Sequence, residues 1–164
     1  MDTAKDKIQK IVRPNEDTTN KQDKPGLERD LANKPTKVHL QSNDPNVELE
    51  PYHAIGKLKG KNAVVTGGDS GVGRSVAILF AMEGATVTII YLPEEEADAQ
   101  HTKAQVEKNG GQVLLVPSDL SKAINCKDVA ARVGSAMSKV DVLVNNAATR
   151  NEDSTIGSIS ELSY

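Results

Sequence analysis

The sequence has no tryptophan and a single phenylalanine, so aromatic residues make up only 2% of its 164 positions. A core must therefore be built from Val, Ile, Leu and Ala side chains, and a chain of this length is expected to form one modest domain. The one cysteine, Cys126, excludes an internal disulfide and a cysteine-based zinc cluster, which fits a reducing, cytoplasmic location. It lies on the apolar stripe of an expected helix, together with Val129, Ala130, Val133 and Met137, which predicts a buried and inert thiol.

Long apolar runs and a strong charge imbalance are also missing. No uncharged apolar stretch approaches the roughly 18 residues that a membrane helix requires, and no secretion signal is visible at the start of the chain. The formal net charge is only −3 with both signs interspersed, so no basic face is expected for nucleic acid. His39, His53 and His101 lack the spacing of metal ligands. The sequence therefore predicts no membrane anchor, no nucleic-acid partner and no metal site.

Residues 1–56 differ in composition from the rest of the chain. They carry five of the prolines and many Asn, Asp, Lys and Gln residues, which predicts a weakly ordered polar extension. Its last part could dock on the following domain through Val47, Leu49, Tyr52 and Ile55.

In residues 57–164 short β-branched runs alternate with longer amphipathic stretches, which indicates βαβ units and a parallel sheet of the α/β class. Strands are expected at 62–66, 86–91, 112–116 and 140–145, and helices at 72–83, from Pro93 to Asn109, and after Ser121 to Met137. The last strand is nearly continuous in apolar residues, which predicts a strand covered on both faces.

A glycine-rich segment joins the first expected strand directly to the first helix. A pyrophosphate bound at a helix N-terminus needs free N–H groups and a backbone without Cβ atoms in the way. Gly67 would allow the tight turn, Gly71 the close approach of phosphate, and Gly73 the packing of helix on strand. The residues expected to hold a dinucleotide here are Gly67, Asp69, Ser70, Gly71, Val72 and Gly73.

Two other interpretations of this segment remain open. The glycines could form a turn that merely links strand and helix. Residues 68–75 also match the outline of a P-loop, except that Arg74 stands where that loop has lysine. The guanidinium of Arg74 is not equivalent to the compact ammonium of lysine. The one candidate magnesium ligand at a strand end is Asp141, and it lies at the beginning of its strand. Nucleotide hydrolysis is therefore disfavoured.

Motifs after three of the strands together resemble the short-chain dehydrogenase/reductase family, over about residues 58–148. The motifs are Thr66-Gly67-x-x-x-Gly71-x-Gly73, then Asp119, then Asn145-Asn146-Ala147. The segments GKLKGK, TGGDSGVGR and YLPEEEADA are similar to NADPH-dependent aldehyde reductase-like or glucose dehydrogenase-like members that have a polar N-terminal extension. The resemblance implies a doubly wound, Rossmann-like parallel sheet, here incomplete with about four strands.

The resemblance also implies a cofactor lying across the carboxyl ends of the strands. Asp119 and Leu120 would approach the adenine, while Asn146, Ala147 and Ala148 would line the path to the ribose and nicotinamide. A turn that merely ends the fourth strand is the alternative interpretation of the asparagines.

The choice of cofactor depends on the end of the second strand, where Tyr91 and Leu92 lie. An acid there would take the ribose hydroxyls of NAD, whereas a basic group would take the 2′-phosphate of NADP. With no carboxylate at that place, and with Arg74 and Ser70 nearby, the sequence favours NADP over NAD. The resembled subgroup points the same way.

Members of the family use a Tyr-x-x-x-Lys pair, in which the lysine lowers the tyrosine pKa. Here Tyr52 is followed at that spacing by Gly56 and Tyr91 by Glu95, and Tyr164 is the last residue, so no catalytic residue is assigned. We expect the N-terminal portion of an NAD(P)(H)-dependent oxidoreductase acting on carbonyl or hydroxyl groups of small molecules. The alternatives are a non-catalytic dinucleotide-binding module and an unstable truncated fragment. An uncovered sheet edge would then favour self-association.

Overall fold

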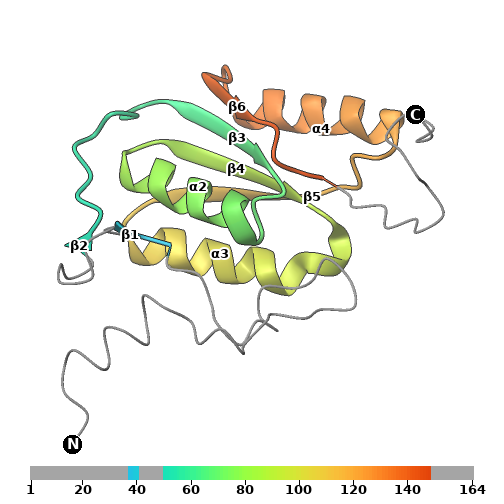
Figure 1. The fold of residues 1–164 in the computed structure, drawn as a ribbon. Helices are drawn as coiled ribbons and strands as arrows, with labels where there is room; N and C mark the ends of the chain where they lie inside the picture. Colours follow the sequence, from blue (N-terminus) through green and yellow to red (C-terminus); the bar gives the residue numbers. More distant parts are fainter. Residues whose placement is uncertain (1–36, 41–49, 149–164) are drawn as a thin grey trace, which may run out of the picture.

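The centre of the protein is a parallel sheet of four strands in the order β5–β4–β3–β6 (Figure 1). The structure is a computed structural model and describes residues 37–40 and 50–148. The strands of this sheet are β3 (Asn62–Thr66), β4 (Thr86–Tyr91), β5 (Gln112–Pro117) and β6 (Val142–Val144). Every neighbouring pair runs parallel, which requires a crossover between successive strands. The predicted α/β class with a parallel sheet is confirmed.

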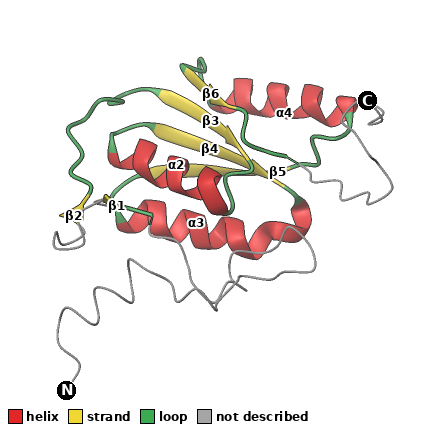
Figure 2. Ribbon diagram, in the orientation of Figure 1, coloured by secondary structure: helices red, strands yellow, loops and turns green. Residues whose placement is uncertain are grey.

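Helices supply the crossovers and cover both faces of the sheet (Figure 2). One face carries α2 (Gly71–Met82) and α3 (Glu96–Lys108), the latter preceded by the short 3-10 turn η2 (Pro93–Glu95), and the other face carries α4 (Ala123–Ala136). Each face has its own apolar core, so the sheet is doubly wound. In the part of the chain that the structure describes, none of the helices has the length and apolar character needed to cross a bilayer.

The strand order reverses once. The chain passes outward from β3 to β4 and β5, and then returns to the other side of β3 to form β6. Val65 and Val144 are partners in the resulting ladder, so the carboxyl ends of β3 and β6 lie side by side. In parallel sheets such a reversal leaves a crevice at the carboxyl ends of the strands, where ligands bind.

The buried face of α4 is narrower than expected. Val129, Val133 and Met137 are buried in a line with a spacing of four residues, whereas Cys126 and Ala130 are exposed. The prediction of a buried thiol is wrong because Cys126 lies in the first turn of α4. That turn contacts the preceding loop rather than the sheet, with the thiol 3.4 Å from the carbonyl oxygen of Leu120.

β6 is shorter than the expected strand and is covered on one face only. Val142 and Val144 pack against the core under α2, but the side chain between them, Leu143, is 58% exposed. The prediction of a strand covered on both faces is therefore wrong for the described residues. The reason lies in the position of α4, whose apolar side chains contact Val64 and Ile90 of the inner strands.

Part of the N-terminal extension contacts the domain through a carboxylate at the end of α2. Glu83 is 4% exposed and accepts hydrogen bonds from the Tyr52 hydroxyl and from the backbone N–H groups of Lys57 (2.6 Å) and Ile55 (3.3 Å). Of the residues expected to dock, Tyr52 therefore does so by its hydroxyl, while the side chain of Ile55 is 77% exposed. Val47 and Leu49 lie outside the described residues.

We predict that Glu83→Gln makes the fold less stable at neutral pH and less sensitive to acid. The hydrogen bond from Tyr52 and those from the backbone hold the pKa of Glu83 below its ordinary value of 4.5. The carboxylate therefore stabilises the fold at about pH 7, and this contribution is lost as the pH falls below 4.5 and through the folded-state pKa. Thermal melts across that range should show the variant and the wild type converging in acid.

The matched control for this prediction is Glu107→Gln. Glu107 forms an exposed i,i+4 pair with Lys103 at 3.9 Å, and such pairs contribute little to stability. A Glu83→Gln protein that melts like Glu107→Gln at every pH would contradict the anchoring role of Glu83.

Candidate functional site

A pocket of about 330 Å³ opens at the carboxyl ends of the strands, at the reversal between β3 and β6. Ten of the residues predicted to bind a dinucleotide line it together, although they come from four separate segments of the sequence. They are Gly67, Asp69, Ser70, Gly71, Val72, Tyr91, Leu120, Asn146, Ala147 and Ala148. The fold thus brings the glycine-rich loop, the end of the fourth strand and the residue after Asp119 to one mouth.

Two of the predicted residues, Gly73 and Asp119, do not line the pocket. Gly73 lies beneath the loop, where a Cβ atom would come within 2.0 Å of the carbonyl oxygen of Gly67. The carboxylate of Asp119 turns back on its own segment, accepting from the N–H of Ser121 at 3.0 Å and pairing with Lys122 at 3.4 Å. Hydrogen bonds from Ser121, above all from its side chain, lower the pKa of Asp119.

The pocket also contains residues that the sequence reasoning did not select as binding residues, namely Ile90, Leu92, Glu95 and Ser118. A signal for them was present. Carboxyl ends of parallel strands meet at one edge of the sheet, so residues that follow β4 and β5 are expected beside those that follow β3. Glu95 lies near the start of the helix expected from Pro93, and helical periodicity does not indicate its place at this mouth.

The loop between β3 and α2 needs glycine at Gly67 for two reasons. Its φ of +63° lies in the left-handed region, and a Cβ atom there would come within 3.0 Å of Asn146 Nδ2 and 3.1 Å of Ala147 Cα. At Gly71 the φ is +52° but nothing lies within 4 Å, so that position stays open towards the mouth.

The N-terminus of α2 offers donors to the pocket. Ser70 is the N-cap, but it makes no side-chain capping bond, and the first turn has no acidic residue. The first backbone bond into the helix runs from the N–H of Arg74 to the carbonyl of Ser70, so the N–H groups of Val72 and Gly73 are not used by the helix ladder. The N-terminus of a helix carries partial positive charge and suits an anion such as phosphate.

Asn146 and Thr66 fasten the end of β6 to this loop. Asn146 Nδ2 donates to the carbonyls of Thr66 (3.0 Å) and Gly67 (2.9 Å). In return, the hydroxyl of Thr66 accepts from the backbone N–H groups of Asn146 (3.0 Å) and Ala147 (2.9 Å). The asparagine side chain therefore bonds to the neighbouring strand and loop rather than to its own turn.

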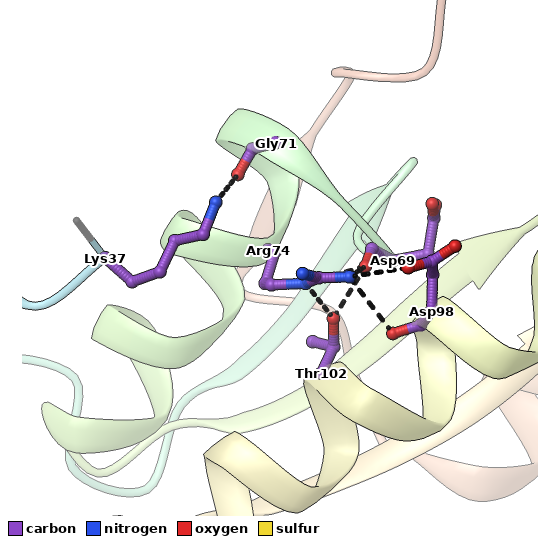
Figure 3. A network of polar contacts seen from close by, with 6 residues as sticks. All are labelled: Lys37, Asp69, Gly71, Arg74, Asp98 and Thr102. Carbon is purple, nitrogen blue, oxygen red and sulfur yellow. Dashed lines mark hydrogen bonds and ion pairs between the residues drawn. The ribbon is translucent and has the colours of Figure 1, made fainter. Parts of the chain in front are cut away.

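Arg74 does not face the pocket, which corrects the argument for NADP that relied on it. The side chain is buried and directed towards α3 (Figure 3). Its guanidinium donates to the carbonyl of Asp69 and to Thr102 Oγ1 (2.8 Å), and it forms an ion pair with Asp98 at 3.3 Å. The guanidinium therefore bonds to groups inside the protein and does not line the pocket.

The same geometry removes the P-loop interpretation. Arg74 is not directed at the mouth, and Asp141 lies at the other end of the strands, where it accepts from the N–H of Asn62 (2.9 Å) and pairs with Lys139 (2.8 Å). Asp141 therefore does not lie beside the loop, where a magnesium ligand would be needed. Within residues 37–40 and 50–148 no cluster of three or more His, Cys, Asp or Glu side chains is arranged to hold a metal ion.

The end of β4 is acidic, contrary to the expectation of no carboxylate there. Tyr91 Oη donates to Glu96 Oε2 at 2.5 Å, and burial, reinforced by this carboxylate, raises the pKa of Tyr91, so the phenol stays neutral. Glu95 lines the pocket, and burial followed by the nearby charge of Asp69 raises its pKa. A carboxyl side chain therefore lies at the mouth of the pocket, close to the end of β4.

Comparison with known proteins gives concordant results. The sequence profile of the short chain dehydrogenase family matches residues 61–163. The chain is 42% identical over 132 residues to NADPH-dependent aldehyde reductase 1, chloroplastic, of Arabidopsis thaliana, covering 77% of this chain and 46% of that protein. It is 41% identical over 132 residues to glucose and ribitol dehydrogenase of Daucus carota, covering 77% and 45%.

Solved structures agree with the sequence matches. Glucose dehydrogenase of Caenorhabditis elegans superimposes with a TM-score of 0.52 at 32% identity, over 57% of this chain and 40% of that one. Hydroxysteroid dehydrogenase of Escherichia coli gives a TM-score of 0.52 at 34% identity, over 56% and 38%. The chain thus spans less than half the length of these relatives. The match over more than half of its residues, together with the gathered motifs, shows that the chain belongs to the short-chain dehydrogenase family.

Proposed function

We propose that this chain forms the nicotinamide dinucleotide-binding part of an oxidoreductase that acts on carbonyl or hydroxyl groups of small molecules. The observation that carries the proposal is the N-terminus of α2, whose N-cap side chain makes no capping bond and which opens under a glycine loop into the pocket at the strand reversal. Membership of the family supports NAD or NADP as the ligand. A bound nicotinamide supplies hydride exchange, and the residues described here would bind and orient it.

The proposed contacts follow the shape of the pocket. The backbone N–H groups of Gly71 and Val72, with the hydroxyl of Ser70, would bind the pyrophosphate. Asn146, Ala147 and Ala148 would line the ribose and nicotinamide side. At the other end, Leu120, with Asp119 beside it, would approach the adenine. Gly73 would act from below, by allowing the loop to approach the helix.

The name of a relative and the lining of the pocket support different cofactors. The Arabidopsis relative is named as NADPH-dependent, which supports NADP as the proposed cofactor. The carboxylate of Glu95 in the pocket would repel a 2′-phosphate and supports NAD as the alternative. Binding of a dinucleotide without turnover, as a non-catalytic module, remains the second candidate function. A cytoplasmic location and the division of the chain at residues 56 and 57 remain predictions.

The proposal is tested by titrating the purified chain with NADH and NADPH and following the fluorescence of the reduced nicotinamide. Circular dichroism must first show a cooperative melt, which separates a folded protein from an unstable fragment. We expect saturable binding of at least one nucleotide. A folded protein that binds neither nucleotide at millimolar concentration would contradict the proposed function.

We predict that Glu95→Gln raises the affinity for NADPH relative to NADH by about fivefold, because removal of one partly screened negative charge is worth about 1 kcal/mol for a doubly charged phosphate nearby. Glu94→Gln is the control, since Glu94 is exposed and does not line the pocket. Dissociation constants for both nucleotides in both variants check the prediction. Equal ratios in the two variants would place the 2′ position away from Glu95.

We also propose self-association through the uncovered side of β6. Leu143 on β6 is 58% exposed, Val140 before the strand is 46% exposed, and β6 ends the described sheet. An open parallel edge with exposed apolar side chains favours pairing with another chain. Sedimentation velocity of the purified chain at two concentrations tests this point.

A further inference from the structure

The carbonyl groups of the loop between β3 and α2 are held by side chains from several directions. Those of Thr66 and Gly67 accept from Asn146 Nδ2, as described above. That of Asp69 accepts from Arg74 and from Thr102 Oγ1 (2.8 Å). A loop whose carbonyls are fixed by the protein keeps its peptide planes in one orientation, which fixes its N–H groups as well.

The support of the Asp69 carbonyl comes from a different helix. Thr102 and Asp98 lie one turn apart on α3, and both contact the guanidinium of Arg74 on α2 (Figure 3). Thr102 is 0% exposed, while Arg74 and Asp98 are both 4% exposed. The network is therefore shielded from water. Hydrogen bonds in such an interior are stronger than those at the surface.

Stability alone is a weak explanation for such a network. Taking a guanidinium and a carboxylate out of water is costly, and buried ion pairs are often no more stabilising than apolar side chains of similar size. The planar fork of arginine does offer something that apolar packing cannot. It can reach the loop carbonyl and both α3 side chains at once.

We propose that Arg74, Thr102 and Asp98 form a positioning network that fixes the loop for binding of a dinucleotide pyrophosphate. This inference rests on the proposed function. It gives α3 a part in cofactor binding although these residues do not line the pocket. Arg74 acts through the Asp69 carbonyl, and the adjacent N–H groups at the start of α2 are held ready for the phosphates. Preorganisation of this kind lowers the cost of ordering the loop on binding.

The decisive variant is Thr102→Val, because removal of Arg74 would leave Asp98 buried without its cation and could prevent folding. The full 164-residue chain is titrated with NADH, which has the pyrophosphate, and with adenosine, which lacks it. We expect Thr102→Val to bind NADH about fivefold more weakly, as for the loss of a typical hydrogen bond, and adenosine unchanged. Thr102→Ser restores the hydroxyl and should restore NADH binding.

Thr88→Val is the matched control. Thr88 is also 0% exposed, but its hydroxyl contacts only Met137 Sδ at 3.7 Å among the described residues, on the opposite face of the sheet. The Thr88→Val substitution makes the same chemical change in the core as Thr102→Val but does not affect a contact with the loop. NADH binding by this variant should therefore stay at the wild-type value. Melting temperatures of all variants report the purely structural effect.

Several results would overturn the inference. Thr102→Val could bind NADH as the wild type does, or it could lose NADH and adenosine in equal proportion, which would indicate general damage to the fold. Thr88→Val could weaken NADH to the same extent as Thr102→Val. Failure of the wild type to bind either NADH or NADPH would instead overturn the proposed function, and this inference with it.

Discussion

Gly73→Ala is expected to abolish dinucleotide binding and to lower the free energy of unfolding by about 3 kcal/mol, the upper part of the range for overpacking. A Cβ atom at this position would come within 2.0 Å of the carbonyl oxygen of Gly67 and 2.6 Å of Asn146 Nδ2. Both contacts involve groups that are fixed, the first by the backbone and the second by its bonds to the loop. The loop must therefore move away from α2.

The loss of binding follows from the direction of that movement. Gly67 and Asn146 both line the pocket, so a displaced loop changes the mouth itself. Titration with NADH and chemical denaturation would measure the two effects on the same sample. Because the melt and the titration are separate readings, a variant that is folded but does not bind is distinguishable from one that is unfolded.

Gly134→Ala is the matched control for this substitution. Gly134 lies in the interior of α4, nothing lies within 4 Å of its Cβ position, and its φ is not positive. Alanine there should raise the free energy of unfolding by about 0.5–1 kcal/mol because it removes backbone freedom from the unfolded chain. If Gly73→Ala were as stable as the wild type and retained NADH, the close approach of loop and helix would not be required.

The glycines show how far local sequence reasoning extends. Strand, loop and helix were correctly ordered because the change from β-branched to helical periodicity occurs at Gly67, and that change is a local property. Gly73 was expected to pack helix on strand, and the structure places it under the loop, against Gly67. The gathering of Tyr91 and Asn146 at the same mouth follows from strand order, which the family motifs implied and periodicity alone did not.

The errors concern contacts that depend on where an element lies in space. Cys126 has the helical spacing of a buried residue, yet it is exposed because the first turn of α4 packs on a loop. Leu143 belongs to a segment with the composition of a buried strand, but α4 does not cover its side chain. Arg74 follows the glycine motif in the sequence, but its side chain crosses to α3 because Asp98 and Thr102 are there. Spacing within one segment contains none of this information.

Thr66→Val is expected to lower the free energy of unfolding by about 2 kcal/mol and to weaken NADH binding by about tenfold. Thr66 is 8% exposed, and its hydroxyl accepts from two consecutive N–H groups, those of Asn146 and Ala147. Valine fills the same space but leaves both donors without this acceptor. Since β6 contacts the described sheet only through β3, its carboxyl end should then separate from the loop. Asn146 and Ala147 would move with it, and the nicotinamide side of the pocket would open.

Thr66→Ser tests whether the hydroxyl is responsible. Serine keeps the acceptor and loses one methyl group, so it should retain most of the NADH affinity while losing only about 1 kcal/mol of stability, the value of a buried methyl group. Hydrogen exchange at residues 142–147 would report the release of the strand end directly, with faster exchange in Thr66→Val than in Thr66→Ser. Equal exchange and equal affinity in the two variants would show that the ladder to β3 and the bonds of Asn146 Nδ2 hold the end of β6 without the hydroxyl of Thr66. The joining of the strand ends by this hydroxyl would then have no part in shaping the pocket.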